Sequence, residues 1–398
     1  MVWKFPIVLA LVVMVVLSAT SFAAVPTPVV LTNDDNPTAG ANSATAFHLV
    51  TSTGALTLIK RLKTGGTGLG GGFFANSGTS IQSNGNCVFV ANTGSDKITS
   101  FAAPSYAKTG NAGFPGMFSA NLAGGSIALS PNGQLLVSGN SGTENISLWS
   151  VGAKCLLTHV ADYVPSMGAD VFSPIAFTPD GTAVVVPAPD FEGAEIFDVV
   201  AGPALEDINS VNWTTVASCA DGCYPTGMDF TNDGTVVLFG NANDQMSSVL
   251  SANIGPAGLS NPQNWPLSVS TSVMCNPNVP WLSQAGAAGQ GELYIGMSGF
   301  GPGFPSGEVT ATFVESPLSI TQEGAGTAIS TPDDILGTIR TVGATGTGTG
   351  GGTMVIAEFP NQIQTATIAA GGAITPGPIT TDPNGGGLLS VSVYPNTR

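Results

Sequence analysis

One short pattern recurs along this chain and also ends it. Apolar residues alternate over a few positions and a polar Asn-Gly or Asp-Gly turn follows, as in GSIALSPNG from Gly125, SPIAFTPDG from Ser173 and GMDFTNDG from Gly227. Such a segment strongly indicates a β-hairpin. In these three copies a second apolar strand follows the turn at once. The last residues, GLLSVSVYPN from Gly387, repeat the first strand and its turn, and the chain then stops.

The start of the chain complements its end. Residues 29–32 (VVLT) have the pattern of a second strand, with no first strand before them. We therefore expect residues 388–394 to pair with residues 29–32 and to close a ring. Shared strands of this kind remove the exposed edges that an open sheet would leave.

The second strands recur at a regular distance. Their spacings are 58, 48, 48, 52, 57 and 61 residues, and they begin at Val29, Cys87, Leu135, Ala183, Thr235, Glu292 and Thr353. A four-stranded propeller blade takes about 40–50 residues. The sequence therefore predicts an all-β fold, a seven-bladed β-propeller formed by a single domain over residues 24–398. Naming the strands of a blade A to D from the inside outward, blade one has strand A from the C-terminus and strands B–D from the N-terminus.

The first residues have the layout of a cleaved export signal. Lys4 supplies a positive charge, residues 7–17 form an apolar core, and residues 21–23 (SFA) fit a small-x-small cleavage site. We assign residues 1–23 to a signal peptide and expect a secreted or periplasmic protein. An uncleaved N-terminal anchor is the alternative. No later run approaches the ~20 apolar residues that span a bilayer, so we expect no membrane span in the mature chain.

The composition argues against a disordered chain and against anionic partners. Glycine accounts for 53 of 398 residues, charged residues for 9% and hydrophobic residues for 43%, which suits short strands with polar turns and not disorder. Without Lys4 the chain has 25 acidic and 8 basic residues, a formal net charge of −17. Such a surface repels phosphate backbones and anionic lipids, so we expect no nucleic-acid partner.

Five cysteines are compatible with an oxidising compartment. Cys219 and Cys223 are close enough to bridge one loop. Cys87 begins a B strand and Cys155 lies in the C–D turn of the next blade, at the same face of the ring, so we predict a second bridge between them. Cys275 is left over, either free or competing for one of these partners.

Three segments resemble a known family. SPNGQLLVSGNSGTENISLWSV, TPDGTAVVVPA and CVFVANTGSDKITSF are similar to the strand–turn–strand repeats of the exported, seven-bladed lactonase-like propellers of the YVTN type. The resemblance covers nearly the whole mature chain as a pattern of turns and alternation. It implies a propeller, and an activity on small cyclic esters of the 6-phosphogluconolactonase kind.

The loops between strands B and C and between strands D and A share one face of a propeller, and many acids fall in them. The D–A loops would carry Asp170, Asp221, Asp333 and Asp334. The B–C loops would carry our candidate ligand- or cation-binding residues, which are Asp34, Asp35, Asp96, Glu144, Asp190, Glu192, Asp244 and Glu358. With interleaved asparagines (Asn33, Asn92, Asn140, Asn241, Asn243) they offer the oxygen donors that calcium prefers. The alternative is that polar turns favour Asp and Asn for backbone reasons.

Aromatic residues give a second candidate surface. They fall in or beside the predicted face loops and first strands, where rings beside polar groups suit a saccharide or a peptide; the alternative is packing between blades. The residues are Phe73, Phe74, Trp281, Phe300, Phe304 and Phe359.

Candidate catalytic residues are few. The resemblance implies His, Arg and Glu at the channel mouth, but His48 and His159 fall on predicted third and fourth strands, away from the channel. Arg340 lies near a predicted first strand. A general base would then be a carboxylate with a raised pKa, and the candidates are Asp170, Asp333 and Asp334.

The sequence favours a monomeric, non-catalytic binding or scaffold protein. Its acidic, Asn-rich loop face would take a small molecule, a saccharide, a protein or a cation such as calcium. The alternative is a lactone hydrolase. A third reading is a structural surface protein without a concave ligand site.

Overall fold

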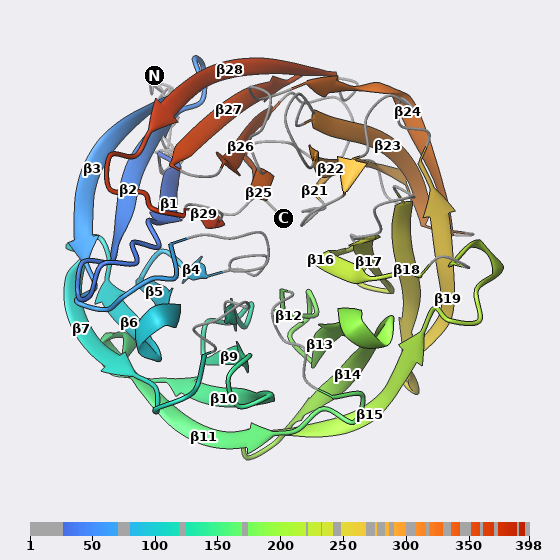
Figure 1. Cartoon of the computed structure of the whole chain (residues 1–398), viewed down its shortest axis with the longest axis horizontal. Coiled ribbons are helices and arrows are strands. Elements are labelled where there is room, and N and C mark those ends of the chain that lie inside the picture. The colour runs from blue at the N-terminus through green and yellow to red at the C-terminus, as the bar shows by residue number, and fades with distance from the viewer. Residues whose placement is uncertain are drawn as a thin grey trace, which may run out of the picture.

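The computed structural model is a closed ring of β-sheets around a central axis (Figure 1). It describes residues 27–394 except for 71–79, 119–124, 169–173, 220–221, 232, 242–247, 268–274, 277–282, 286–289, 300–306, 316–317, 329–335, 343–351, 359–360, 370–372 and 388–389. The predicted signal peptide lies outside these residues.

Each of the first three sheets has four strands, and the first contains both ends of the described chain. The first runs β29 (Ser390–Tyr394), β1 (Val29–Asn33), β2 (Ser43–Val50) and β3 (Ala55–Lys63). The second runs β4 (Ile81–Ser83), β5 (Cys87–Asn92), β6 (Lys97–Ala102) and β7 (Ala107–Ala112). The third runs β8 (Ser126–Leu129), β9 (Leu135–Asn140), β10 (Asn145–Val151) and β11 (Leu157–Tyr163).

The next two sheets repeat this order. The fourth runs β12 (Ala176–Phe177), β13 (Ala183–Ala188), β14 (Gly193–Val200) and β15 (Ala204–Asn212). The fifth runs β16 (Pro225–Phe230), β17 (Val236–Asn241), β18 (Ser248–Gly255) and β19 (Gly258–Pro266).

The last two sheets complete the ring. The sixth pairs β20 (Cys275–Asn276) and β21 (Ser283–Ala285) with β22 (Gln290–Gly299), followed by β23 (Gly307–Glu315) and β24 (Leu318–Ala328). The seventh runs β25 (Leu336–Val342), β26 (Gly352–Glu358), β27 (Gln362–Ile368) and β28 (Ile374–Thr381). Short 3-10 helices lie at η1 (Thr93–Ser95), η2 (Ala153–Cys155), η3 (Pro189–Phe191) and η4 (Ala217–Cys219).

The number of blades differs from our expectation. Hydrogen bonding groups the described strands into seven sheets, of which six have the regular order of four strands. The sixth sheet departs from the repeat because two short strands, β20 and β21, share its inner edge where the other sheets have one strand. The propeller fold is confirmed, with six regular blades where seven were expected.

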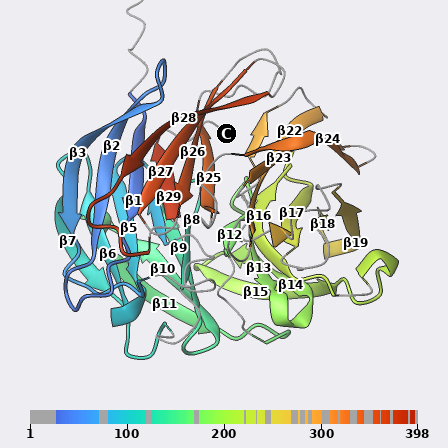
Figure 2. The ribbon, with the colours of Figure 1, turned by 45° about the horizontal axis from the view of Figure 1, so that its top comes forward.

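The ring closes by the predicted pairing of chain ends. β29 is antiparallel to β1, with Val29 opposite Tyr394 and Asn33 opposite Ser390. Figure 2 shows β29 between β1 and β25, so the last strand lies at the junction of the first and seventh sheets. Val391 and Val393 are buried there in one cluster with Val30 and Val355.

The core lies between neighbouring sheets. Every residue of β5 and β13 is buried, because a B strand is covered on both faces by adjacent sheets. Large side chains fill these layers, as where Trp213 meets Phe239 edge-on at 5.6 Å. The D strands β3, β7, β11, β15, β19, β24 and β28 lie along the rim in Figure 1.

The A–B turns of the second to fifth sheets each pack on the preceding sheet. A Cβ atom on Gly85 would lie 2.0 Å from Cζ of Tyr394, and one on Gly133 would lie 2.4 Å from Nδ2 of Asn84. Both glycines have positive φ, +82° and +69°. The Asn-Gly turns therefore serve the hairpin and also let neighbouring blades approach.

Both predicted disulfides are present. Cys87 and Cys155 link the second and third sheets with Cα atoms 5.5 Å apart, and Cys219 and Cys223 close a short loop. Cys275 begins β20. The bridges are compatible with an exported protein. Within the described part of the chain, no helix is long and apolar enough to cross a membrane.

Candidate functional site: the B–C turns and the ring seam

Four of the candidate acids occupy equivalent places in their blades. Asp35, Asp96, Glu144 and Glu192 each lie in a B–C turn and have left-handed backbone, with φ of +47°, +54°, +52° and +50°. Aspartate adopts this conformation more readily than most residues do. The backbone of the turn therefore accounts for Asp35 and Asp96, whereas for the two glutamates it gives no such preference.

Three of these carboxylates hold a D–A loop. Asp96 accepts hydrogen bonds from the backbone N–H groups of Gly116 and Phe118 at 2.9 and 2.8 Å. Asp35 accepts from those of Leu69 and Gly70, both at 3.1 Å. In each case the B–C turn and the D–A loop of one blade are joined at the loop face.

Glu192 has the same role in the fourth sheet. Its carboxylate accepts a hydrogen bond from the N–H of Cys223 at 3.1 Å, which joins the turn to the loop closed by the second disulfide. Asp35, Asp96 and Glu192 therefore fit the alternative that these acids serve the backbone, because their oxygens accept hydrogen bonds from main-chain amides.

The remaining candidates divide into exposed, buried and undescribed residues. Glu144 and Asp190 are exposed at the loop face. Glu358 is fully buried at the end of β26. Outside the described residues lie Asp170, Asp221, Asp244, Asp333 and Asp334, and also Asn243 and the candidate aromatic residues Phe73, Phe74, Trp281, Phe300, Phe304 and Phe359.

The candidate asparagines end their B strands and are buried. Asn92 donates to the hydroxyl of Thr99 at 2.9 Å, Asn140 to that of Ser147 at 2.6 Å and Asn241 to that of Ser248 at 2.9 Å. Each bond joins strand B to strand C seven residues later. Asn33 instead reaches the second sheet, at Ser80 and Ala91. These amides link strands and blades.

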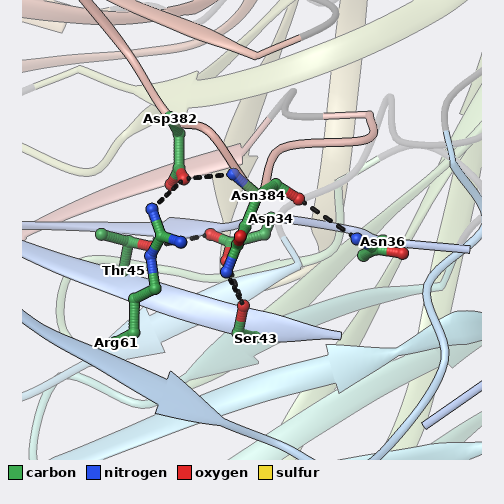
Figure 3. A network of polar contacts seen from close by, with 7 residues as sticks. All are labelled: Asp34, Asn36, Ser43, Thr45, Arg61, Asp382 and Asn384. Atoms are coloured by element: carbon green, nitrogen blue, oxygen red, sulfur yellow. Dashed lines mark hydrogen bonds and ion pairs between the residues drawn. The ribbon is translucent and has the colours of Figure 1, made fainter. Parts of the chain in front are cut away.

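Asp34 lies in a separate network where the ring closes (Figure 3). It follows β1, is fully buried, and accepts hydrogen bonds from the hydroxyls of Ser43 and Thr45 on β2, the latter at 3.0 Å. Its carboxyl group also interacts electrostatically with that of Asp382, which follows β28 and is equally buried. Arg61 on β3 forms an ion pair with Asp382 at 3.1 Å.

The electrostatics of this pair are unusual. The pKa of Asp34 is raised to about 8, mainly by burial and secondly by the charge of Asp382. The Asn384 N–H donates to Asp382 at 3.0 Å, and the Asn36 side chain donates to the Asn384 carbonyl at 3.4 Å. The network therefore connects the D–A loop of the last sheet with the first blade.

Another buried carboxylate, Glu195 on β14, was not among the candidates. It accepts hydrogen bonds from the N–H groups of Ser166 and Met167 at 2.9 and 3.1 Å, holding the loop after β11. Burial raises its pKa, and the charge of Asp207 contributes. Its position in a strand, outside any turn, gave no sequence signal.

The residues expected of a hydrolase are dispersed. His48 is exposed on β2, and His159 on β11 lies 2.8 Å from Asp162 and packs edge-on against Trp149. Arg340 is half-buried on the inner strand β25, and burial lowers its pKa to about 9. In the part of the chain that is described, no three His, Cys, Asp or Glu side chains form a set that could hold a metal ion.

Comparisons with known proteins show the fold alone. No family model matches the chain, and no curated protein matches it either. Solved structures do match, with TM-scores of 0.62–0.63.

Three structures illustrate the likeness. A proposed 6-phosphogluconolactonase of Bacteroides fragilis has 13% identity and a TM-score of 0.63, over 94% of this chain and 99% of that one. The periplasmic gluconolactonase of Pseudomonas aeruginosa has 12% identity and a TM-score of 0.63, over 93% and 99%. A protein from Lactobacillus plantarum has 13% identity and a TM-score of 0.62, over 92% and 99%. This chain is thus similar in fold to lactonase-like propellers.

Proposed function

We propose that this protein is an exported β-propeller that binds a ligand or partner on its loop face and is not a catalyst. The observation that supports this most is the shared role of Asp35, Asp96 and Glu192, whose carboxylates bind the backbone of D–A loops. Loops fixed in this way form a preorganised surface, which lowers the entropic cost of binding. The same hydrogen bonds engage the carboxylates with backbone amides, whereas a general base must be within reach of a substrate proton.

The ligand would be a small molecule, a saccharide or a protein, with Glu144 and Asp190 as exposed contacts and Asp244 in a neighbouring loop. Calcium is a further proposed ligand, because carboxylate and amide oxygens recur at this face. We also propose seven blades, with the sheet around β22 as the irregular one. Secretion or export to the periplasm as a monomer, after cleavage of residues 1–23, completes this proposal.

A lactone hydrolase is the second proposal, favoured by two observations. The structural neighbours include proteins described as lactonases, and Arg340 supplies a half-buried cation on an inner strand. In this reading Arg340 would orient the ester, with Asp170, Asp333 or Asp334 as the base.

A lactone-hydrolysis screen of the purified mature protein, with and without calcium, distinguishes the two proposals. The binding proposal predicts no turnover above the uncatalysed rate. Turnover that survives chelation, falls in Asp170→Asn and Arg340→Lys, and is unchanged in Glu206→Gln on the outer strand β15 would establish the hydrolase. Calcium is tested separately by its effect on the unfolding midpoint.

A further inference from the structure

The ring seam contains a buried set of charges that does not balance. Asp34 and Asp382 are both fully buried, the charge of Asp382 acts on Asp34, and one guanidinium, that of Arg61, forms an ion pair with Asp382. Two ionised carboxylates with one arginine would leave a net negative charge inside the protein. An uncompensated buried charge is strongly unfavourable.

The hydrogen bonds indicate how the charge is balanced. Asp382 Oδ1 accepts hydrogen bonds from Arg61 and from the Asn384 N–H, whereas its Oδ2 is buried and has no hydrogen-bond partner among the described residues. A proton on Asp34 would give that oxygen a donor. It would also reduce the network to one ion pair and one neutral acid, with the hydroxyls of Ser43 and Thr45 still donating to Asp34.

The position of the pair gives it a structural role. Asp34 directly follows β1, the strand that pairs with β29, and its carbonyl accepts a hydrogen bond from the Gly386 N–H at 2.9 Å. Asp382 begins the same loop, which leads from β28 into β29. The two carboxyl groups therefore join the segment that delivers the closing strand to the blade that receives it.

We propose that Asp34 is protonated and donates a hydrogen bond to Asp382. This hydrogen bond stabilises the closed ring, and it is lost as the pH rises. The charged groups that face Asp34 are Asp382 from the loop after β28 and Arg61 from β3. Lys63 lies opposite Ser43 on β3 and is exposed, and Asp35 turns to the amides of Leu69 and Gly70.

The sign of the pH dependence follows from linkage. The pKa of Asp34 is raised from 3.8 to about 8 in the folded protein, so between these values the folded state holds a proton that the unfolded state has lost. The stabilisation is complete below about pH 4 and is lost as the pH rises towards 8. In this window the unfolding constant due to Asp34 rises about tenfold per pH unit.

The test compares the mature protein with Asp34→Asn, whose amide can donate to Asp382 without titrating. Urea unfolding from pH 5 to 9 gives the ratio of the two unfolding constants, in which other titrating groups cancel. We expect the ratio of wild type to variant to rise about tenfold per unit from pH 5 to 7 and to level off above 8. A ratio that is constant with pH would overturn the proposal. Glu144→Gln controls for the change in net charge.

A second measurement does not depend on the variant folding. Hydrogen exchange of the wild type, corrected for intrinsic rates, should show β1 and β29 losing protection between pH 6 and 9 more than β9 and β10 do. Protection of β1 and β29 that does not fall over this range would contradict a proton-dependent contact at the seam. Calcium that raises the wild-type unfolding midpoint at pH 8, but not that of Asp34→Asn, would also overturn it, because the pocket would then hold a cation in place of the proton.

Discussion

Asp96 shows how one acidic side chain serves both its turn and a distant loop. Asparagine tolerates the same left-handed backbone, so Asp96→Asn should keep the turn while losing the charge and one of two acceptor oxygens for Gly116 and Phe118. Since hydrogen bonds to a charged group contribute more than neutral ones, we expect a loss of about 1–2 kcal/mol in the free energy of unfolding. Urea unfolding measures it.

Asp190→Asn is the matched control, because it removes an exposed acid from the corresponding turn of another blade. That variant should change the free energy of unfolding by less than about 0.5 kcal/mol. Equal effects of the two variants would mean that the amide contacts of Asp96 do not hold the D–A loop.

At the scale of single residues, the sequence placed these acids in the correct turns but not their partners. An acid or asparagine before a C strand follows from local backbone preference, so Asp96 and Glu192 could be located from the repeat. Their hydrogen bonds go to loops about 20–30 residues later, whose paths depend on the assembled blade. Asp382 was missed because its partners, Arg61 and Asp34, lie more than 300 residues earlier in the chain.

At the scale of elements, the packing of Gly85 against Tyr394 tests how the A–B turns fit together. Gly85→Ala would force a side chain onto a left-handed backbone and into the tyrosine ring. We expect a loss of about 2–4 kcal/mol, of which ~1 kcal/mol is backbone strain and the rest overpacking. Gly40→Ala, with a similar φ of +70° and open space around it, should lose only the backbone part.

The double variant Gly85→Ala, Tyr394→Ala isolates the contact. If the two side chains collide, removing the ring should recover most of the overpacking, and the two effects should be less than additive in thermal or urea unfolding. Full additivity would show that Tyr394 does not lie against this turn.

Strands of the regular blades could be predicted closely, and the sixth sheet could not. The second strands predicted from Cys87, Leu135 and Ala183 begin at those residues in the structure. At these residues the apolar pattern and the preceding Asn-Gly or Asp-Gly turn both predict that a strand begins, so local sequence preference and the overall fold coincide. Around β22 no such turn marks the inner edge, and two short strands divide it.

At the scale of the molecule, removal of β29 tests whether the closed ring unfolds as one cooperative unit. A variant lacking the residues from Ser390 onward would leave β1 with an unpaired edge and remove Val391 and Val393 from the core. Burial of a valine contributes about 1.5–3 kcal/mol, so we expect the two together to cost roughly 3–6 kcal/mol, with the strand's hydrogen bonds in addition. Because β29 joins the two ends of the described chain in one sheet, the loss should lower one global unfolding transition.

Two comparisons show whether the strand or its apolar contacts cause this loss. Val391→Ala with Val393→Ala keeps the backbone pairing with β1 and should destabilise less than the deletion does. A synthetic peptide of residues 387–398, added to the truncated protein, should restore the transition in proportion to its concentration. An unchanged midpoint after truncation would mean that the blades hold together through their side-by-side packing alone and that the pairing of the chain ends contributes nothing to stability.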